Sequence, residues 1–299
     1  MAVDLSVIIP SLDNSVELED CLLALREQSA DFDFEVIVVD SGADNHIEEV
    51  IRQFPFVQLI RSGRRLVPGA ARNLGVSRAA SDRLAFLDAD CIPSGNWLQQ
   101  AYASMQEDHK IIGGPIHDLQ NRGAIQWADN QLQFSSFRAG RGKGFVEHLP
   151  SCNLVMERAT FQSLGGFHED VPTGEDALLS SLSEQLHPRG IWFNPKLVIT
   201  HRGRATLRSF VSHQSSLGYY RGLLQLAFTP AWDWLSRSPW LAGLALCRRF
   251  AYVAYNTWKY NRKDTLRFML FSPILLFGLA AWTTGFYRGV ARRRSGGHG

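Results

Sequence analysis

Short apolar runs alternate with longer, mixed stretches along the first third of the chain. Helical stretches are predicted over residues 15–28, 45–53 and 68–80, the last with a proline at its start. Strands separated by helices of about 10–15 residues are typical of a parallel sheet with helices on both faces. We therefore predict a three-layer α/β fold. The apolar runs that suit its buried strands occupy residues 5–9, 35–39, 57–60 and 84–87.

Two aspartates, Asp88 and Asp90, directly follow the apolar run that ends at Leu87. Residues two apart in an extended backbone project to the same side, and open α/β sheets bind ligands at the carboxyl ends of their strands. Two carboxylates there can hold a divalent cation such as Mg2+ or Mn2+, with the remaining positions left for phosphate oxygens. The alternative is a pair of acidic loop residues that cap the next helix.

The first two predicted strands also end in polar residues. Pro10 and Asp13 follow the first strand, and Asp40 follows the second. An aspartate at such a place can accept hydrogen bonds from a nucleobase N–H or from ribose hydroxyls; the alternative for Asp40 is a helix-capping or turn residue. The chain has neither a G-x-G-x-x-G after its first strand nor a P-loop sequence anywhere, which disfavours dinucleotide-binding and P-loop proteins.

Composition sets further bounds on the chain. A length of 299 residues with 45% hydrophobic residues suits one large domain with an appendage. The four cysteines are widely scattered, without a C-x-x-C pair. Neither a zinc site nor a disulfide framework is therefore expected.

Charge is unevenly distributed, because residues 230–299 hold eleven Lys and Arg against two Asp, while the remainder is acidic. Residues 268–287 form an uncharged run, which at about 1.5 Å per residue is long enough to cross a ~30 Å bilayer core. The arginines that follow would conflict with the positive-inside tendency if catalysis is cytosolic. We expect an interfacial or re-entrant helical tail at a membrane surface; the alternative is a helical subdomain packed on the core. The apolar content disfavours nucleic acid as the partner.

Several motifs follow one another in a set order. After Pro10 come residues 38–44 (VVDSGAD), 69–75 (GAARNLG) and 86–90 (FLDAD), and then residues 151–156 (SCNLVM), 165–167 (GGF), 174–176 (GED) and 201–204 (HRGR). Over roughly residues 4–222 this order resembles the family-2 glycosyltransferases, which have a GT-A fold and transfer a sugar from a nucleoside diphosphate sugar. The resemblance implies a GT-A catalytic domain over residues 1–222, with a nucleotide-sugar half over 1–115 and an acceptor half over 116–222. Residues 223–299 then form the membrane-associating region.

The resemblance also implies roles for individual residues. Asp90 matches the metal-binding aspartate of the family's D-x-D motif, and Asp88 its partner, which contacts ribose or metal. His201 matches a histidine that in some members touches the metal or the diphosphate; the alternative is a structural histidine. Asp176, preceded by Glu175, matches the proposed general base, and a single base opposite the leaving group implies inversion at the anomeric carbon. The remaining residues matched to nucleotide-sugar binding are Pro10, Asp13, Asp40 and Arg72.

Two departures from the family pattern refine the expectation. The aromatic residue that usually precedes Asn14 in the first motif is absent, and so is the Q-x-x-R-W signature of processive members. We therefore expect a non-processive, metal-dependent, inverting glycosyltransferase at the cytoplasmic face of a membrane. It would use a UDP-linked donor and a saccharide or lipid-linked acceptor in glycan or glycolipid synthesis. The alternatives are a nucleotidyltransferase and a catalytically degenerate nucleotide-sugar-binding membrane protein.

Overall fold

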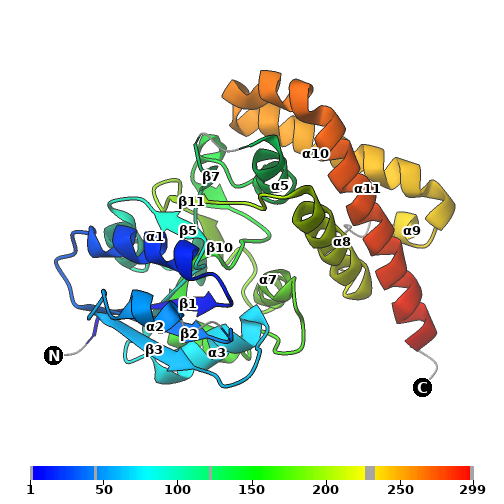
Figure 1. Cartoon of the computed structure of the whole chain (residues 1–299). Coiled ribbons are helices and arrows are strands. Elements are labelled where there is room, and N and C mark those ends of the chain that lie inside the picture. Colours follow the sequence, from blue (N-terminus) through cyan, green and yellow to red (C-terminus); the bar gives the residue numbers. More distant parts are fainter. Residues whose placement is uncertain (1–2, 44–45, 121–122, 226–232, 297–299) are drawn as a thin grey trace. The chain divides into compact units, whose positions relative to one another are not determined.

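The structure is a computed structural model that describes residues 3–43, 46–120, 123–225 and 233–296. Two compact units make up the chain (Figure 1). The first, here called the sheet unit, comprises Met1–His117 and Gly142–His201. The second, here called the helical unit, comprises Asp118–Arg141 and Arg202–Gly299.

The sheet unit begins with the predicted alternation of strands and helices. Strands β1 (Leu5–Ser11), β2 (Phe34–Asp40), β3 (Val57–Arg61) and β4 (Arg83–Leu87) are parallel and lie in the order β3-β2-β1-β4. The connecting helices are α1 (Ser15–Arg26), α2 (His46–Ile51) and α3 (Pro68–Arg78). The strand order reverses between β1 and β4, and such a switch point is where open α/β sheets form ligand crevices. The carboxyl ends of β1, β2 and β4 therefore meet at one edge.

The parallel pairing predicted for the four early strands is confirmed, whereas the later strands of the unit pair in both directions. Strand β9 (Asn153–Glu157) pairs antiparallel with both β4 and β6 (Ile111–Gly113), and β10 (Ile191–Phe193) is parallel to β6 but antiparallel to β8 (Gly144–Phe145). The result is a mixed eight-stranded sheet. These later strands have two to five residues each, which is too short for hydrophobic alternation to signal them or their direction.

A small second sheet carries part of the strand-end chemistry. Its strands are β5 (Cys91–Pro93), β11 (Ile199–His201) and β7 (Ile116–Asp118), with β11 in the middle. Strands β5 and β11 are antiparallel, and their register places His201 opposite Cys91. The other helices of the sheet unit are α4 (Trp97–Ser104), α6 (Arg158–Ser163) and α7 (Glu175–Leu186).

Within its described residues, the helical unit contains four helices of more than ten residues: α5 (Ala124–Phe134), α8 (Leu207–Leu223), α10 (Ala242–Tyr260) and α11 (Thr265–Gly296). Its short elements are η1 (Ala139–Arg141), α9 (Asp233–Ser236), η3 (Pro239–Leu241) and η4 (Arg262–Asp264). Its core packs Trp127 of α5 and Phe210 of α8 against Leu275 and Leu279 of α11. Helices α8 and α11 approach so closely that a Cβ added to Gly218 would collide with the carbonyl of Trp282.

The helical unit takes helices from both sides of the boundary expected at residue 222. Helix α8, which lies before that boundary, packs along α11, and α5 also contacts α11. The chain therefore passes from one compact unit to the other at residues 117/118, 141/142 and 201/202. Among the described residues, Arg262–Ser295 form one helix that is long and apolar enough to cross a membrane, judged by length and composition alone.

Candidate functional site

The loops after β1 and β2 are joined to each other at the sheet edge. Asp13 has a positive φ of 52°, and its Oδ1 accepts a hydrogen bond from the backbone N–H of Ala43 at 3.0 Å. Gly42 lies so close that a Cβ there would be 2.5 Å from Asp13 Oδ1. Asp13 thus joins the two loops through this hydrogen bond. The resemblance matched Asp13 to nucleotide-sugar binding, and the contact seen here is a structural one. Pro10 lies within β1, directly opposite Val39 of β2.

Asp40 is a buried carboxylate at the end of β2. It is 2% exposed, and its Oδ2 lies 3.4 Å from Nη1 of Arg61, the residue directly opposite on β3. Burial raises the pKa of Asp40, and the hydrogen bond from Gly42 and the charge of Arg61 only partly oppose this effect. Oδ2 accepts no hydrogen bond and is ion-paired with Arg61. Asp40 lies well before α2, so it does not cap that helix.

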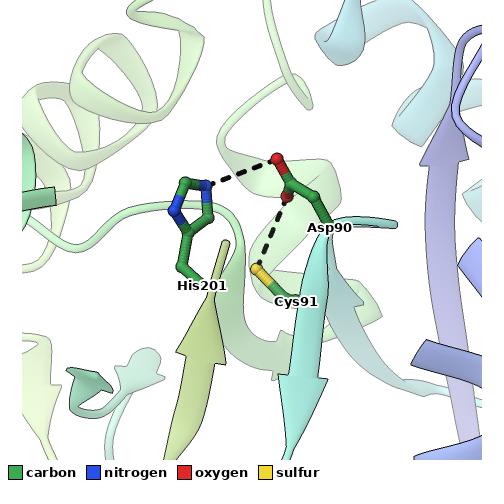
Figure 2. Close-up of side chains that lie close together, drawn as sticks. All are labelled: Asp90, Cys91 and His201. Atoms are coloured by element: carbon green, nitrogen blue, oxygen red, sulfur yellow. Dashed lines mark hydrogen bonds and ion pairs between the residues drawn. The ribbon is translucent and has the colours of Figure 1, made fainter. Parts of the chain in front are cut away.

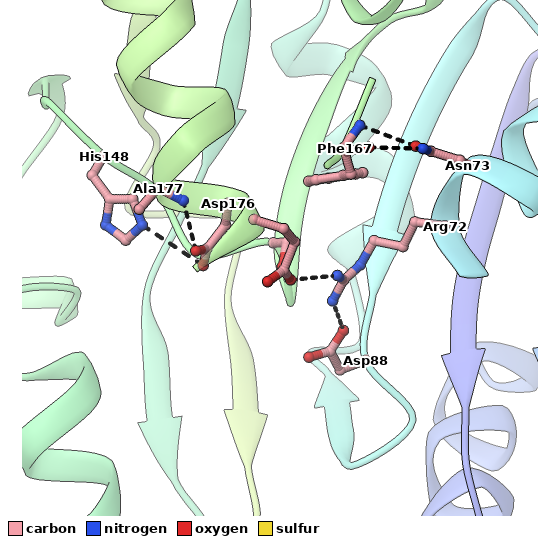
Figure 3. Close-up of polar contacts among 9 residues, drawn as sticks. Arg72, Asn73, Asp88, His148, Phe167, Asp176 and Ala177 are labelled. Atoms are coloured by element: carbon pink, nitrogen blue, oxygen red, sulfur yellow. Dashed lines mark hydrogen bonds and ion pairs between the residues drawn. The ribbon is translucent and has the colours of Figure 1, made fainter. Parts of the chain in front are cut away.

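Arg72 links the end of β4 to the start of α7. Its Nη2 donates to Asp88 Oδ1 at 2.5 Å, and its Nη1 donates to Glu175 Oε1 at 2.8 Å (Figure 3). Burial lowers the pKa of the Arg72 guanidinium, but the two carboxylates outweigh this effect and the net pKa is raised. Burial also raises the pKa of Glu175, which accepts a further hydrogen bond from Ser151 Oγ at 3.3 Å.

Two residues near Arg72 on helix α3, Gly69 and Asn73, contact the loop before α7 and so fix the position of Arg72. The side-chain amide of Asn73 donates to the carbonyl of Phe167 at 2.8 Å and accepts from its N–H at 3.0 Å (Figure 3). A Cβ on Gly69 would be 2.5 Å from the carbonyl oxygen of His168. In the motif at residues 69–75, Gly69 therefore allows the backbones to approach closely, Asn73 anchors the helix to the loop, and Arg72 bridges the two carboxylates.

Asp176 lies beside Glu175 but has different surroundings. Its Oδ1 accepts from the N–H of Ala177 at 2.7 Å, and its Oδ2 lies 3.6 Å from His148 Nε2 (Figure 3). The Asp176 side chain is 19% exposed, whereas that of Glu175 is 7% exposed and bonded to Arg72. Of the two carboxylates, Asp176 is therefore the one that a small molecule can reach.

Asp90 lies next to the histidine predicted as its partner. Asp90 Oδ2 is 3.4 Å from His201 Nε2, and the thiol of Cys91 lies 3.8 Å from Asp90 Oδ1 (Figure 2). The antiparallel register of β5 and β11 produces this arrangement. One ligand atom from each of Asp90, Cys91 and His201 lies within 4.8 Å of the others, as in a metal-binding cluster.

The donor set of this cluster suits a hard divalent cation. Carboxylate oxygen and imidazole nitrogen are acceptable ligands for Mn2+, and carboxylate oxygen for Mg2+. The thiol sulfur of Cys91 is a soft donor and a poor ligand for these ions. Asp90 and His201 fit the predicted role. Asp88 is outside this cluster and is bonded to Arg72 instead.

Most of the predicted residues are thus brought together in two linked groups of the sheet unit: Asp88, Arg72 and Glu175, and Asp90 with His201. Sequence reasoning missed His148 and Asn73. Asn73 stood inside a motif already noted, whereas no sequence signal marks His148. Cys91 was detectable as the residue that directly follows Asp90.

Comparison with known proteins identifies the family. The profile described as "Glycosyl transferase family 2" matches residues 6–165, which is more than half of the chain. Pre-mycofactocin glycosyltransferase of Mycobacterium tuberculosis is 25% identical over 223 residues, covering 72% of this chain and 46% of that protein. Glycosyltransferase AglE of Haloferax volcanii is 25% identical, covering 57% of this chain and 58% of AglE. The chain thus spans about half the length of these two relatives.

Solved structures share the fold. A mannosyltransferase from Pyrobaculum calidifontis, solved with GDP-Man and Mn2+, has a TM-score of 0.57 at 16% identity, covering 100% of this chain and 89% of that one. S. aureus TarS 1–349, solved with UDP-GlcNAc, has a TM-score of 0.56 at 16% identity, covering 98% and 92%. The predicted GT-A fold with a long apolar C-terminal helix is confirmed.

Proposed function

The chain belongs to glycosyl transferase family 2, and from that premise we propose that it transfers a sugar from a nucleoside diphosphate sugar to a hydroxyl acceptor. One observation carries the proposal. At the switch point of the sheet, Asp88 is bonded to Arg72 and Asp90 lies beside His201. This edge thus offers acidic cation ligands, with Asp88 fixed by the buried Arg72, and a cation bound there would supply the positive charge that a bound diphosphate needs.

The donor is proposed to be UDP-linked. Asp40 supports this assignment by its place, because it is a carboxylate at the end of β2 beside the switch point of the sheet, and an aspartate at such a place can accept the N–H of a uracil ring. Asp13 keeps the two flanking loops together and so supports the nucleotide indirectly. TarS has been solved with UDP-GlcNAc, whereas the mannosyltransferase has been solved with GDP-Man. The donor screen described below therefore includes GDP-linked sugars, so that a GDP-linked donor can be told from a UDP-linked one.

Metal dependence is part of the proposal, with Asp90 and His201 as the residues that hold Mg2+ or Mn2+ and Asp88 close by. The cation, when bound, supplies positive charge that stabilises the leaving diphosphate. Arg72 keeps Asp88 in place from the other side. The bound Mn2+ in the mannosyltransferase structure supports this part of the proposal.

Asp176 is proposed as the general base. It accepts the proton of the acceptor hydroxyl while that oxygen forms a bond to the anomeric carbon and the bond to the diphosphate oxygen breaks. One base opposite the leaving group gives inversion. Glu175 is bound to Arg72 and Ser151, so we assign it the positioning of Arg72 instead of proton transfer.

The setting of the reaction is also proposed. A single sugar addition fits the missing processivity signature, and a saccharide or a lipid-linked molecule serves as the acceptor. The C-terminal region has a large excess of positive charge and carries exposed apolar side chains. Both features favour work at a membrane surface, on its cytoplasmic face.

A donor screen tests the activity. The purified protein is incubated with Mn2+ and each of a set of UDP- and GDP-linked sugars, and the release of nucleoside diphosphate is measured. Hydrolysis or transfer from one nucleotide class is the expected result, and adding chelator should abolish it. A folded protein that turns over none of the donors would contradict the proposal.

A further inference from the structure

The exposed side of α11 changes character part of the way along the helix. From Leu266 to Ala280, every exposed residue of α11 is apolar, whereas Thr284, Arg288 and Arg292 are exposed further on. Leu266 is 74% exposed and Leu270 is 70% exposed. The exposed residues between Leu266 and Ala280 are here called the apolar face; its large members are Leu266, Met269, Leu270, Leu276 and Phe277.

The apolar face is one continuous stripe. Its members recur at intervals of three and four residues, which places them on the same side of a helix. Continuing the same spacing leads to Thr284 and Arg288, so one side of α11 is apolar first and then polar. A large exposed apolar surface on a protein marks a site of contact with a partner or a membrane.

The opposite side of α11 is occupied along its length. Phe268, Leu275 and Leu279 pack into the core formed with Trp127 and Phe210. Further along, Trp282, Phe286 and Val290 form a second cluster, with Leu217 of α8 packed against it. The apolar face is therefore what remains of the hydrophobic surface of α11 after the helical unit has packed.

The dimensions of the apolar face favour a helix that lies along a membrane. From Leu266 to Ala280 the helix rises about 21 Å at roughly 1.5 Å per residue, which is shorter than the ~30 Å hydrocarbon core. A crossing helix would also have to leave α8, to which it is joined by close glycine contacts, or take α8 with it. Since α8 contains Arg208, His213 and Arg221, its insertion would be costly.

Charges at both ends of the apolar face indicate the kind of membrane. Arg262 and Lys263 are exposed just before it, and Arg288 and Arg292 are exposed after it. Trp258, at the end of α10, is 53% exposed, and exposed tryptophan is enriched at membrane–water interfaces. Apolar side chains flanked by basic ones complement a bilayer surface that carries anionic headgroups.

We propose that the apolar face of α11 is the surface that docks on an anionic lipid bilayer, with α11 lying in the interface and its basic end remaining in water. The inference deepens the membrane attachment proposed above, since it names the surface and excludes a crossing of the bilayer.

Site-directed fluorescence tests both parts. Of the four cysteines, only Cys247 is exposed, so a Cys247→Ser variant provides a background without a reactive thiol. Leu270→Cys and Thr284→Cys are then introduced separately and labelled with an environment-sensitive maleimide dye. Each labelled protein is mixed with phosphatidylcholine vesicles with and without phosphatidylglycerol, and an aqueous quencher is added.

With anionic vesicles, the dye at position 270 should shift its emission to the blue and be protected from the quencher, while the dye at position 284 should stay accessible. Protection of both positions would show that α11 enters the bilayer along its length and would overturn the proposal. Accessibility of both, in a protein that sediments with the vesicles, would place the contact elsewhere. If the unlabelled protein does not sediment with the vesicles, the proposal of membrane attachment itself is wrong.

A pair of substitutions gives an independent check. Leu270→Asp with Phe277→Asp should weaken vesicle binding by about ten-fold or more, because two apolar anchors are lost. The matched control is Thr284→Asp, on the same side of the helix but outside the apolar face, which should weaken it far less. Equal effects in both would contradict the inference. Nucleoside diphosphate release from the donor in solution should be unchanged in all three proteins, so failure of the transferase proposal is seen separately.

Discussion

Arg72 Nη1 lies 2.8 Å from Glu175 Oε1, a contact between residues 103 positions apart in the sequence. Through its other nitrogen the same guanidinium contacts Asp88. The donor-side motif after β4 and the acidic motif that begins α7 are thus joined by one buried side chain. Because the link is electrostatic and buried, both motifs depend on Arg72 for their positions.

This link predicts a large loss of stability when Arg72 is replaced. Arg72→Met leaves the buried Glu175 carboxylate without its cation, and breaking a buried pair in this way costs about 3–5 kcal/mol. Adding Glu175→Gln should restore part of the loss. Urea denaturation gives the free energies of unfolding, and Arg78→Met, at an exposed position of the same helix, should change stability by less than about 0.5 kcal/mol. A loss as small as that of the control would contradict the link.

The assignment of the base predicts different effects for two neighbouring carboxylates. Asp176→Asn should lower the rate of transfer by about 100- to 10,000-fold, the usual contribution of a general base. Donor affinity should change little, since the role concerns the acceptor. Steady-state kinetics and nucleotide binding measure the two quantities. Full activity in Asp176→Asn with a large loss in Glu175→Gln would transfer the role to Glu175.

His148 is predicted to position Asp176. Its Nε2 lies 3.6 Å from Asp176 Oδ2, so His148→Ala should allow the carboxylate to turn away and should lower kcat by about 10- to 100-fold, as small displacements of catalytic groups do. The KM for the donor should stay the same, and His148→Gln, which keeps a polar N–H, should recover part of kcat. His46→Ala, at an exposed position, serves as the control. A loss of donor affinity equal to the loss in kcat would instead indicate a general structural role.

The close contact of α8 and α11 predicts sensitivity to a single methyl group. Gly218→Ala places a Cβ against the carbonyl of Trp282, and overpacking of this kind costs about 1–3 kcal/mol. Gly243→Ala, in α10, has open space around it and should be neutral or slightly stabilising, because alanine favours helix. Thermal unfolding of both variants makes the comparison. Equal melting temperatures would show that the two helices can separate without cost.

Sequence patterns located the elements that position the site and much of the site itself. The apolar runs of β1, β2 and β4 are long enough to be recognised, and their polar ends held Asp40, Asp88 and Asp90. The pairing of His201 with Asp90 was expected only from the family resemblance, since it depends on the β5–β11 register, and these strands have three residues each.

Other features could not be predicted from local patterns. His148 lies in the loop between β8 and β9, and the course of that loop brings it to Asp176. The sequence of the loop has no hydrophobic periodicity from which this contact could be predicted. Helix α5 lies in the helical unit although it comes from the middle of the chain, because Trp127 finds its apolar partners on α10 and α11. Long-range packing of this kind decides which segments form one compact unit, whereas the boundary expected at residue 222 came from the extent of the family resemblance.

Titration calorimetry with UDP and GDP, each with and without Mn2+, tests the central claim most directly. The account predicts Mn2+-dependent binding of a nucleoside diphosphate in the unmodified protein. Binding should weaken strongly in Asp90→Asn, which removes one carboxylate charge from a hard-cation site. Asp108→Asn, at a carboxylate that is 97% exposed, should bind as the unmodified protein does. Nucleotide binding of equal strength with and without Mn2+, unchanged in Asp90→Asn, would contradict the account.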